Sequence, residues 1–298
     1  MVLGDGIRYN VATLPPEEQL RFRDAFIKAH REYLFPDGVS GWFKQDHIHQ
    51  ATHVHGGAQF LPWHRELCNR FEEILRKVDP EISLHYWRYD NTNPIQSKLL
   101  GPDGLFGASH DIVGPPLDIL HNRGILKGSR DEDPAHPNPA LPPKEIVRDV
   151  RQRFPFCPPD EAIITYADDE DIQYQWQLFR EELEFSSHGP AHNYIAGTLA
   201  TPHDSFTDIL ALILHSNVDR IWASWQLQPG KEWRLDPEKI YGAEHNESEL
   251  NVAMEPWAGG TVRPEQKIRP WGIDWPAEMK TAKDVVKPPR YQEIVIVK

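Results

Sequence analysis

Apolar residues recur at helical spacing near the start of the chain. They are Phe22, Phe26, Ala29 and Tyr33. Two prolines and two glutamates at 15–18 suit the first turn of a helix, because proline needs no N–H partner there and the acids lie at the positive dipole end. The pattern predicts a helix that ends at the turn sequence 35–38, followed by a more polar helix over 41–52.

Three further helices are predicted. The clearest begins at about Pro62, carries His64 at the start of its apolar stripe and stops at Asp79. Its apolar positions are Leu67, Phe71, Ile74 and Val78. A second helix covers about 173–184, and a strongly apolar one runs from about 205 to 226.

The remaining chain is punctuated by proline and glycine. Residues 90–160 predict loops, and residues 229–298 predict an irregular tail, rich in Pro and Trp, that covers the helices. Without internal repeats or a low-complexity linker, we expect one domain over 1–298, with its core at about 8–228. The predicted fold class is mainly α, an antiparallel helix bundle with long loops.

The charge balance excludes several classes of partner. The chain has 298 residues, with 32 basic and 45 acidic side chains and a net charge of −13. This balance argues against non-specific nucleic-acid binding and against an anionic membrane surface as partner. No apolar run approaches the ~18 residues of a spanning helix. The N-terminal segment lacks the basic and apolar regions of a secretory signal, so a cytoplasmic location is expected.

Histidines cluster in two stretches of the sequence. The first stretch contains His47, His49, His53, His55 and His64, and the second contains His188, His192, His203 and His215. His188 and His192 are four residues apart and share one face of a helix, so they can bind one metal ion. His215 lies in an apolar helix, where an unpartnered imidazole costs roughly 1–3 kcal/mol. The clusters therefore predict metal ligands.

The donor set favours copper. Imidazole suits Zn, Cu, Fe and Ni, and copper(II) ranks high for nitrogen ligands. The Glu-x-x-His pairs of di-iron bundles and the His-Glu-x-x-His motif of zinc proteases do not occur beside these histidines. Cys68 and Cys157 lack the spacing of a thiolate site. Two all-histidine sets indicate a dinuclear copper site.

Two motifs resemble the copper motifs of the tyrosinase and catechol oxidase (polyphenol oxidase) family. Phe60-Leu-Pro-Trp-His64-Arg65 resembles the first, and His215-Ser-Asn-Val-Asp219-Arg220-Ile-Trp222 resembles the second. The similarity extends over most of the chain, with weaker matches at 8–10, 256–257 and 281–285. It implies a type-3 dicopper site in a short form of the family, without a C-terminal shielding domain.

The resemblance also implies the ligands. It places His47, His55 and His64 on one copper ion, and His188, His192 and His215 on the other. His47 is preferred because the stretch from it to Gly56 matches one branch of the family. His49 and His53 are expected to face solvent or to lie behind the ligands, although either remains an alternative to His47.

Supporting roles follow from the same resemblance. Asp219 is expected to hold the helix of His215 or the neighbouring Arg220. Glu184 matches a glutamate that, together with an asparagine, holds a water molecule that deprotonates monophenols. Gly189 stands where that asparagine is found in relatives, and Asn193 is the candidate substitute.

Three further departures from the family pattern lie near the second copper motif. Leu214 replaces a histidine before the last ligand. Asp208–Ala211 lacks a usual proline and phenylalanine, and Ala196–Leu199 replaces Gly-Gly-x-Met. His215 is still assigned as the ligand, because it lies four residues before Asp219, as the ligand does in the motif.

The implied activity is oxidation of small phenols with O2 as co-substrate. We expect o-diphenols, o-aminophenols or methoxyphenols to give o-quinones, with monophenol hydroxylation (monooxygenase activity) weaker because of Gly189. The alternatives are a haemocyanin-like oxygen carrier and a zinc hydrolase that uses the same histidines. A copper-delivery protein fits this chemistry as a partner, and the pattern specifies no oligomeric state.

Overall fold

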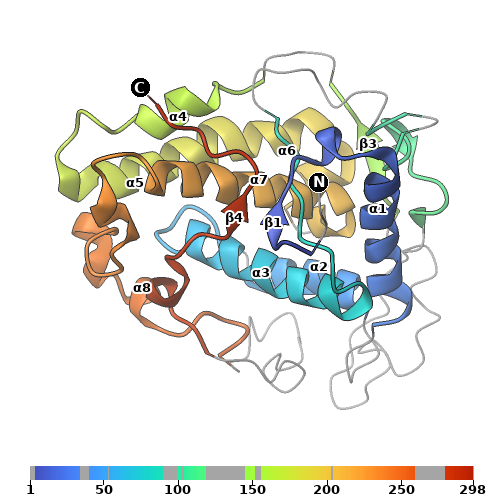
Figure 1. The fold of residues 1–298 in the computed structure, drawn as a ribbon, viewed down its shortest axis with the longest axis horizontal. Coiled ribbons are helices and arrows are strands. Elements are labelled where there is room, and N and C mark those ends of the chain that lie inside the picture. The colour runs from blue at the N-terminus through green and yellow to red at the C-terminus, as the bar shows by residue number, and fades with distance from the viewer. Residues whose placement is uncertain are drawn as a thin grey trace.

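The computed structural model of the protein describes residues 4–33, 40–52, 54–89, 99–101, 104–118, 145–151, 156–202, 204–258 and 279–297. Helices form most of the regular structure in these ranges (Figure 1), as the sequence predicts. None of the described helices is long and apolar enough to cross a membrane.

The first three helices lie where the sequence predicts them. They are α1 (Pro16–Arg31), α2 (Gly41–Thr52) and α3 (Phe60–Val78). Helix α1 buries Phe22, Phe26 and Ala29 on one face. Helix α3 begins two residues before Pro62, so this proline lies in the first turn, where its missing N–H costs nothing.

The helix predicted over 173–184 is longer than expected. Helix α5 (Ile172–Glu182) continues into a π-helical turn (Leu183–His188) and then into α6 (Gly189–Ile195). Pro190 has no N–H to donate to the carbonyl four residues earlier, so an ordinary α-helix would lose a bond here. The π turn absorbs this defect, and the N–H of Gly189 bonds to the carbonyl of Glu184, five residues back.

Helix α7 (Ile209–Gln226) is the centre of the described structure. Every residue of this helix is buried. The prediction placed its start at Ser205, but a separate helical turn at 205–207 comes first, and the Asp208 side chain then caps α7 by accepting a bond from the Leu210 N–H. Because α7 is surrounded by protein, His215 at its middle is held in a fixed environment.

Short elements complete the described structure. Helix α4 (Asp160–Thr165) lies at the end of the region predicted as loop, and α8 (Ser248–Asn251) belongs to the tail. Strand β1 (Ile7–Arg8) pairs in parallel with β4 (Arg290–Tyr291). Strand β2 (His110–Ile112) pairs antiparallel with β3 (Val147–Asp149). Single helical turns lie at 11–13, 197–200, 232–235, 242–246 and 282–285.

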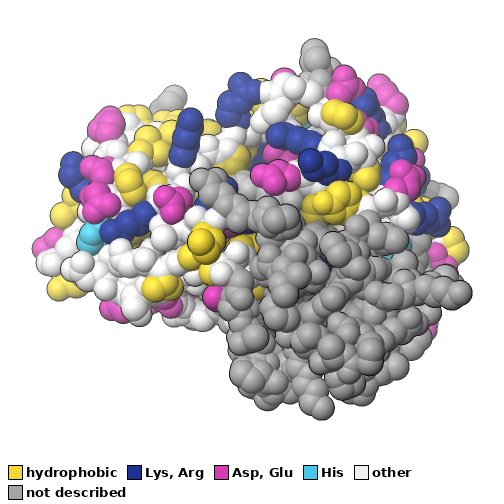
Figure 2. Space-filling model, turned by 90° about the horizontal axis from the view of Figure 1, so that it is seen from below, with side chains coloured by type: hydrophobic (Ala, Val, Ile, Leu, Met, Phe, Trp, Pro, Cys, Tyr) yellow, Lys and Arg dark blue, Asp and Glu magenta, His cyan; other side chains and the backbone are white. Residues whose placement is uncertain are grey.

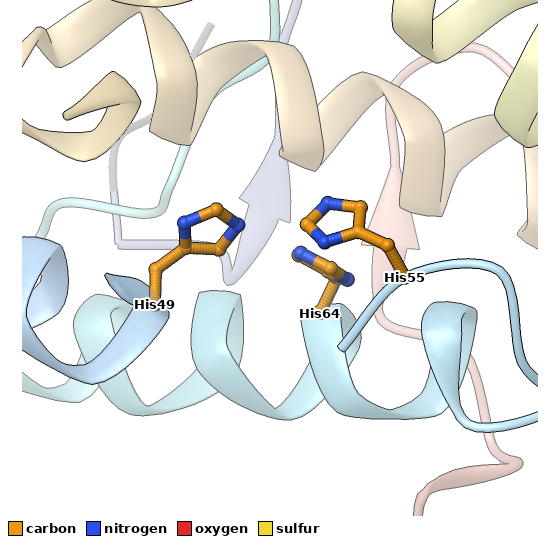
Figure 3. A group of neighbouring side chains, drawn as sticks. All are labelled: His49, His55 and His64. Atoms are coloured by element: carbon orange, nitrogen blue, oxygen red, sulfur yellow. The ribbon is translucent and has the colours of Figure 1, made fainter. Parts of the chain in front are cut away.

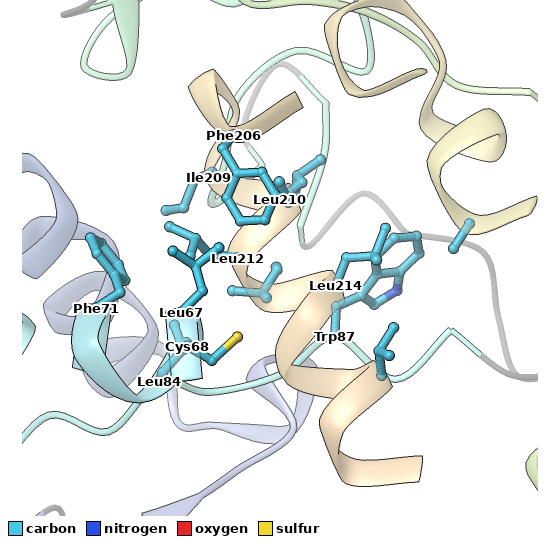
Figure 4. Packing of buried hydrophobic residues seen from close by; sticks show 14 of the residues in the cluster. Leu67, Cys68, Phe71, Leu84, Trp87, Phe206, Ile209, Leu210, Leu212 and Leu214 are labelled. Carbon is cyan, nitrogen blue, oxygen red and sulfur yellow. The ribbon is translucent and has the colours of Figure 1, made fainter. Parts of the chain in front are cut away.

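One apolar cluster joins α3 to α7 (Figure 4). On α3 it contains Leu67, Cys68 and Phe71, each no more than 1% exposed. On α7 it contains the whole apolar run from Ile209 to Leu214. Burying each large side chain contributes roughly 1.5–3 kcal/mol. This interface therefore fixes how the two helices lie against each other, and each of them carries one of the candidate ligands.

Charged side chains of both signs are interspersed on the face shown in Figure 2. Lysine and arginine side chains lie among aspartate and glutamate side chains over the described part of that face. The net charge of −13 is therefore not gathered there into one acidic patch.

A buried ion network links α3, α7 and both ends of the described chain. The Asp219 carboxylate accepts bonds from Arg65 Nε, from Arg8 Nη1 at 3.1 Å and from the Tyr291 hydroxyl at 2.6 Å. The sequence predicted that Asp219 would hold His215 or Arg220, and the structure gives it other partners. Arg220 pairs instead with Asp160.

Arg65 also fastens the tail to the helices. Its Nη1 donates to the carbonyl oxygens of Val285 and Val286, and its guanidinium lies 3.4 Å from the ring centre of Trp222. Trp257 stacks on Trp63 of α3 with ring centres 5.4 Å apart. The described part of the tail thus packs against α3 and α7.

Replacing Asp219 by Asn tests the importance of this network. The variant leaves Arg8 and Arg65 buried without their shared carboxylate, and breaking such a buried pair typically costs about 3–5 kcal/mol. We expect the free energy of unfolding, measured by urea denaturation, to fall by that amount. Exposed Asp169→Asn is the control, and equal stability of the two variants would contradict the role assigned to Asp219.

Candidate metal centre

Three histidines from different elements meet at the first site. His49 comes from α2, His55 from the loop after it, and His64 from α3, and their rings converge (Figure 3). One ring nitrogen from each lies within 4.8 Å of the others. His49 and His64 are each 2% exposed, so the site is closed to bulk water on their side.

Among the described side chains, His49 completes this triad, at the position for which the sequence favoured His47 and kept His49 as an alternative; the choice of His47 stays a prediction. The expectation that His49 faces solvent or stands behind the ligands is wrong, since its ring is buried beside His55. Residues two apart on an α-helix are separated by about 200° around the axis, so one ion does not take both. The His47 side chain and residue His53 lie outside the described residues.

The second triad is the predicted one. His188 ends the π turn, His192 follows on α6, and His215 comes from the middle of α7. His215 Nε2 lies 3.3 Å from both His188 Nε2 and His192 Nε2. The helix predicted to end at Glu184 instead continues, and this continuation brings His188 and His192 onto one face toward α7.

Hydrogen bonds to backbone carbonyls orient two of the rings. His64 Nδ1 lies 2.8 Å from the carbonyl oxygen of Phe60, and His192 Nδ1 lies 2.7 Å from that of Leu199. A carbonyl oxygen can only accept, so both Nδ1 atoms carry the proton and both Nε2 atoms present a lone pair. This is the tautomer that a metal ligand requires.

The environment keeps the imidazoles of the second triad neutral. Burial lowers the pKa of His192 to about 4. Burial and the neighbouring imidazoles also hold the pKa values of His188 and His215 well below their usual range. Neutral rings with converging Nε2 atoms are the donor set that copper or zinc takes. The residues therefore fit a metal ion at each triad.

The two triads face each other across a short distance. The rings of His64 and His215 are stacked with centres 4.3 Å apart, and those of His55 and His188 lie 5.7 Å apart. Phe60 lies between the triads, 4.8 Å from His64 and 5.0 Å from His188. Two ions held in this way are close enough to act on one small molecule.

Sequence reasoning missed a second aromatic ring at the site. The Phe206 ring lies 4.4 Å from His49 and 5.0 Å from His215. The sequence pattern predicts the loss of an aromatic group near the site, because Ala211 stands where the family has a phenylalanine, and the structure nevertheless places the Phe206 ring beside the ligands. The sequence signal for Phe206 was its position two residues before Asp208, the residue that caps α7.

Glu184 connects the segments that carry the two triads. Its Oε1 accepts a hydrogen bond from the Gly56 N–H at 2.8 Å. A residue near the second triad therefore holds the loop that carries His55. Burial raises the pKa of Glu184 to about 7, although the Gly56 N–H and Arg180 oppose this shift. The carboxyl group can therefore take up or release a proton near neutral pH.

A cavity of about 300 Å³ opens beside the histidines. His49, His55, His188 and His192 line it, together with Glu184. Gly189 and Asn193, the two positions singled out by the sequence, also line it. The structure therefore brings the metal site, a titratable carboxyl and an amide to one cavity that can admit a small molecule.

Residues 24–228 match the family model described as the common central domain of tyrosinase. The chain belongs to the tyrosinase family. Tyrosinase from Streptomyces antibioticus is 26% identical over 276 residues, which cover 84% of this chain and 92% of that protein. The tyrosinase family is a type-3 dicopper family, and the two triads supply six imidazoles for two copper ions.

Solved structures of the tyrosinase fold agree with this assignment. A functional unit of Octopus hemocyanin has a TM-score of 0.58 at 19% identity and covers 97% of this chain and 68% of its own. A polyphenol oxidase from Thermothelomyces thermophila has a TM-score of 0.58 at 16% identity, covering 96% of this chain and 87% of its own. At these identities the comparison establishes the shared fold.

Copper content distinguishes His49 from His47. We expect His49→Ala to lower the bound copper from two ions to one per chain, because two imidazoles remain in the first triad. His47→Ala is the matched variant on the same helix, and we expect it to retain two ions. Elemental analysis after dialysis measures both, and the opposite pattern would restore His47 as the ligand.

Proposed function

We propose that the chain is a single-domain dicopper oxidase, an antiparallel helix bundle that converts o-diphenols into o-quinones and also oxidises related o-aminophenols, to o-quinone imines, and methoxyphenols. The observation that carries the proposal is the pair of facing triads beside a cavity, with His64 and His215 stacked 4.3 Å apart. Candidate ligands are His49, His55 and His64 for one ion. His188, His192 and His215 are the candidates for the other.

Copper, when bound, supplies the redox chemistry between the phenol and O2. Each diphenol gives up two electrons and two protons, so two diphenols reduce one O2 to two waters. The six neutral imidazoles leave the positive charge of the metals uncompensated, which favours an incoming phenolate. Phe60 and Phe206 pack against the ligand rings and hold their orientation.

Proton handling falls to Glu184 and Asn193 in this proposal. Both line the cavity, and the Glu184 carboxyl has a pKa of about 7. Relatives hold a water molecule with a glutamate and an asparagine. Glu184 supplies the carboxyl group here, but Gly189 stands in place of the asparagine and supplies no amide. We therefore propose that diphenol oxidation exceeds monophenol hydroxylation.

Oxygen uptake by the copper-loaded protein tests this function. We expect sustained uptake with catechol and with o-aminophenol, at one O2 for every two quinones, and much slower uptake with tyrosine. Reversible, stoichiometric O2 binding without quinone formation would favour a carrier like the hemocyanin relatives. Loss of all uptake, with zinc retained in preference to copper, would favour a hydrolase.

Replacing Gly189 by Asn tests the account of monophenol activity. A Cβ at this position meets only the Glu184 carbonyl at an ordinary 3.5 Å, and the backbone is helical, so the fold accepts the change. One added hydrogen bond of about 0.5–1.5 kcal/mol should raise the monophenol-to-diphenol ratio roughly 3- to 10-fold. Gly189→Ala is the control, and an unchanged ratio in Gly189→Asn would contradict the account.

A further inference from the structure

One part of the lining of the cavity beside the metal centre is apolar. Phe185, Leu199, Ala200 and Pro202 form this part. Phe185 belongs to the π turn and is 64% exposed, so its ring is open to a molecule in the cavity. Leu199 is 1% exposed, so this part of the lining is rigidly packed from behind.

The polar groups that line the cavity, apart from the histidines, are one carboxyl and two neutral groups. Among the described lining residues they are Glu184, Asn193 and Ser205, and no lysine or arginine occurs. The Ser205 hydroxyl is buried and has no hydrogen-bond partner in the described structure, so it is available to a neutral polar group. Nothing in this lining neutralises a negative charge on a bound molecule.

Arg180 lies behind Glu184 but does not supply that charge. Its guanidinium is 2% exposed and is absent from the cavity lining. It bonds to Glu244 at 3.0 Å and to Glu181 at 3.3 Å, and lies 3.9 Å from Glu184 Oε2. Three carboxyl groups already surround this one cation, so its field does not favour another anion.

We propose that the enzyme selects phenols whose ring substituent is uncharged and largely apolar, and discriminates against substituents that carry a carboxylate. This inference rests on the proposed function and adds the substrate class. The phenol end of the substrate faces the histidines, so its substituent contacts Phe185, Leu199 and Pro202. A carboxylate placed there loses water without gaining a cationic partner.

A matched pair of substrates isolates this effect. The pair is 3,4-dihydroxyphenylpropanoic acid and its methyl ester, which share the catechol ring and differ in the charge of the substituent. We expect kcat/KM for the ester to exceed that for the acid by about 10-fold or more, with most of the difference in KM. Calorimetric binding of both compounds to zinc-loaded protein should show the same order without turnover.

Two variants place a cation on the cavity lining from different segments. Phe185→Arg and Ala200→Lys change exposed side chains, and each should lower the ester-to-acid ratio at least about 5-fold in oxidation and in binding. Tyr174→Arg is the matched control, because it puts an arginine at an exposed aromatic position of α5 that does not line the cavity. It should leave the ratio unchanged.

The outcomes separate this inference from the proposed function. Equal use of acid and ester by the unaltered protein, or ratios that Phe185→Arg and Ala200→Lys change no more than Tyr174→Arg does, would overturn the inference alone. Absence of oxidation with both compounds would overturn the proposed function, while the zinc-loaded binding measurement would still decide whether the cavity prefers the ester.

Discussion

One buried carboxylate, that of Asp219, balances two arginines that come from distant parts of the chain. Arg8 lies on β1, Arg65 follows the ligand His64 on α3, and Asp219 lies one turn after His215 on α7. These ion pairs therefore connect α3 to α7. Helix α3 carries one histidine of the first triad, and α7 carries one histidine of the second. The network therefore adds to the apolar interface between α3 and α7, and both hold the two helices in the arrangement that stacks His64 on His215.

The fold was predictable wherever a helix has one apolar face. Helices α1 and α3 follow the 3.6-residue period closely, and their positions agree with the sequence. The helix across Glu184 was predicted to end too early, because the apolar period that marks it is lost beyond Glu184. Only tertiary packing against α7 shows that the chain instead forms a π turn and continues. The partners of Asp219 likewise could not be predicted from the sequence, because Arg65 and Asp219 are more than 150 positions apart.

At the metal centre, the sequence identified the two histidine clusters, but it favoured His47 on α2 where the described structure places His49 beside His55 and His64. That helix is buried on most sides and has no single apolar stripe, so its orientation cannot be read from periodicity. Contacts from the chain before α7 set it: Trp42 donates to the Phe206 carbonyl, and the Phe206 ring packs on His49. For the second triad, the four-residue spacing of His188 and His192 and the copper motif that contains His215 were sufficient, although the π turn that ends at His188 was not predicted.

The π turn also fixes the number of residues that can connect α5 to α6. Each residue advances an α-helix by about 100° of rotation, so losing one residue between Leu183 and His188 would turn His188 and His192 away from His215 while leaving α5 in place. Gaining one residue would turn them the other way. A substitution at Phe185 therefore leaves the second triad in place, whereas an insertion or deletion between Leu183 and His188 would break the triad without replacing any ligand.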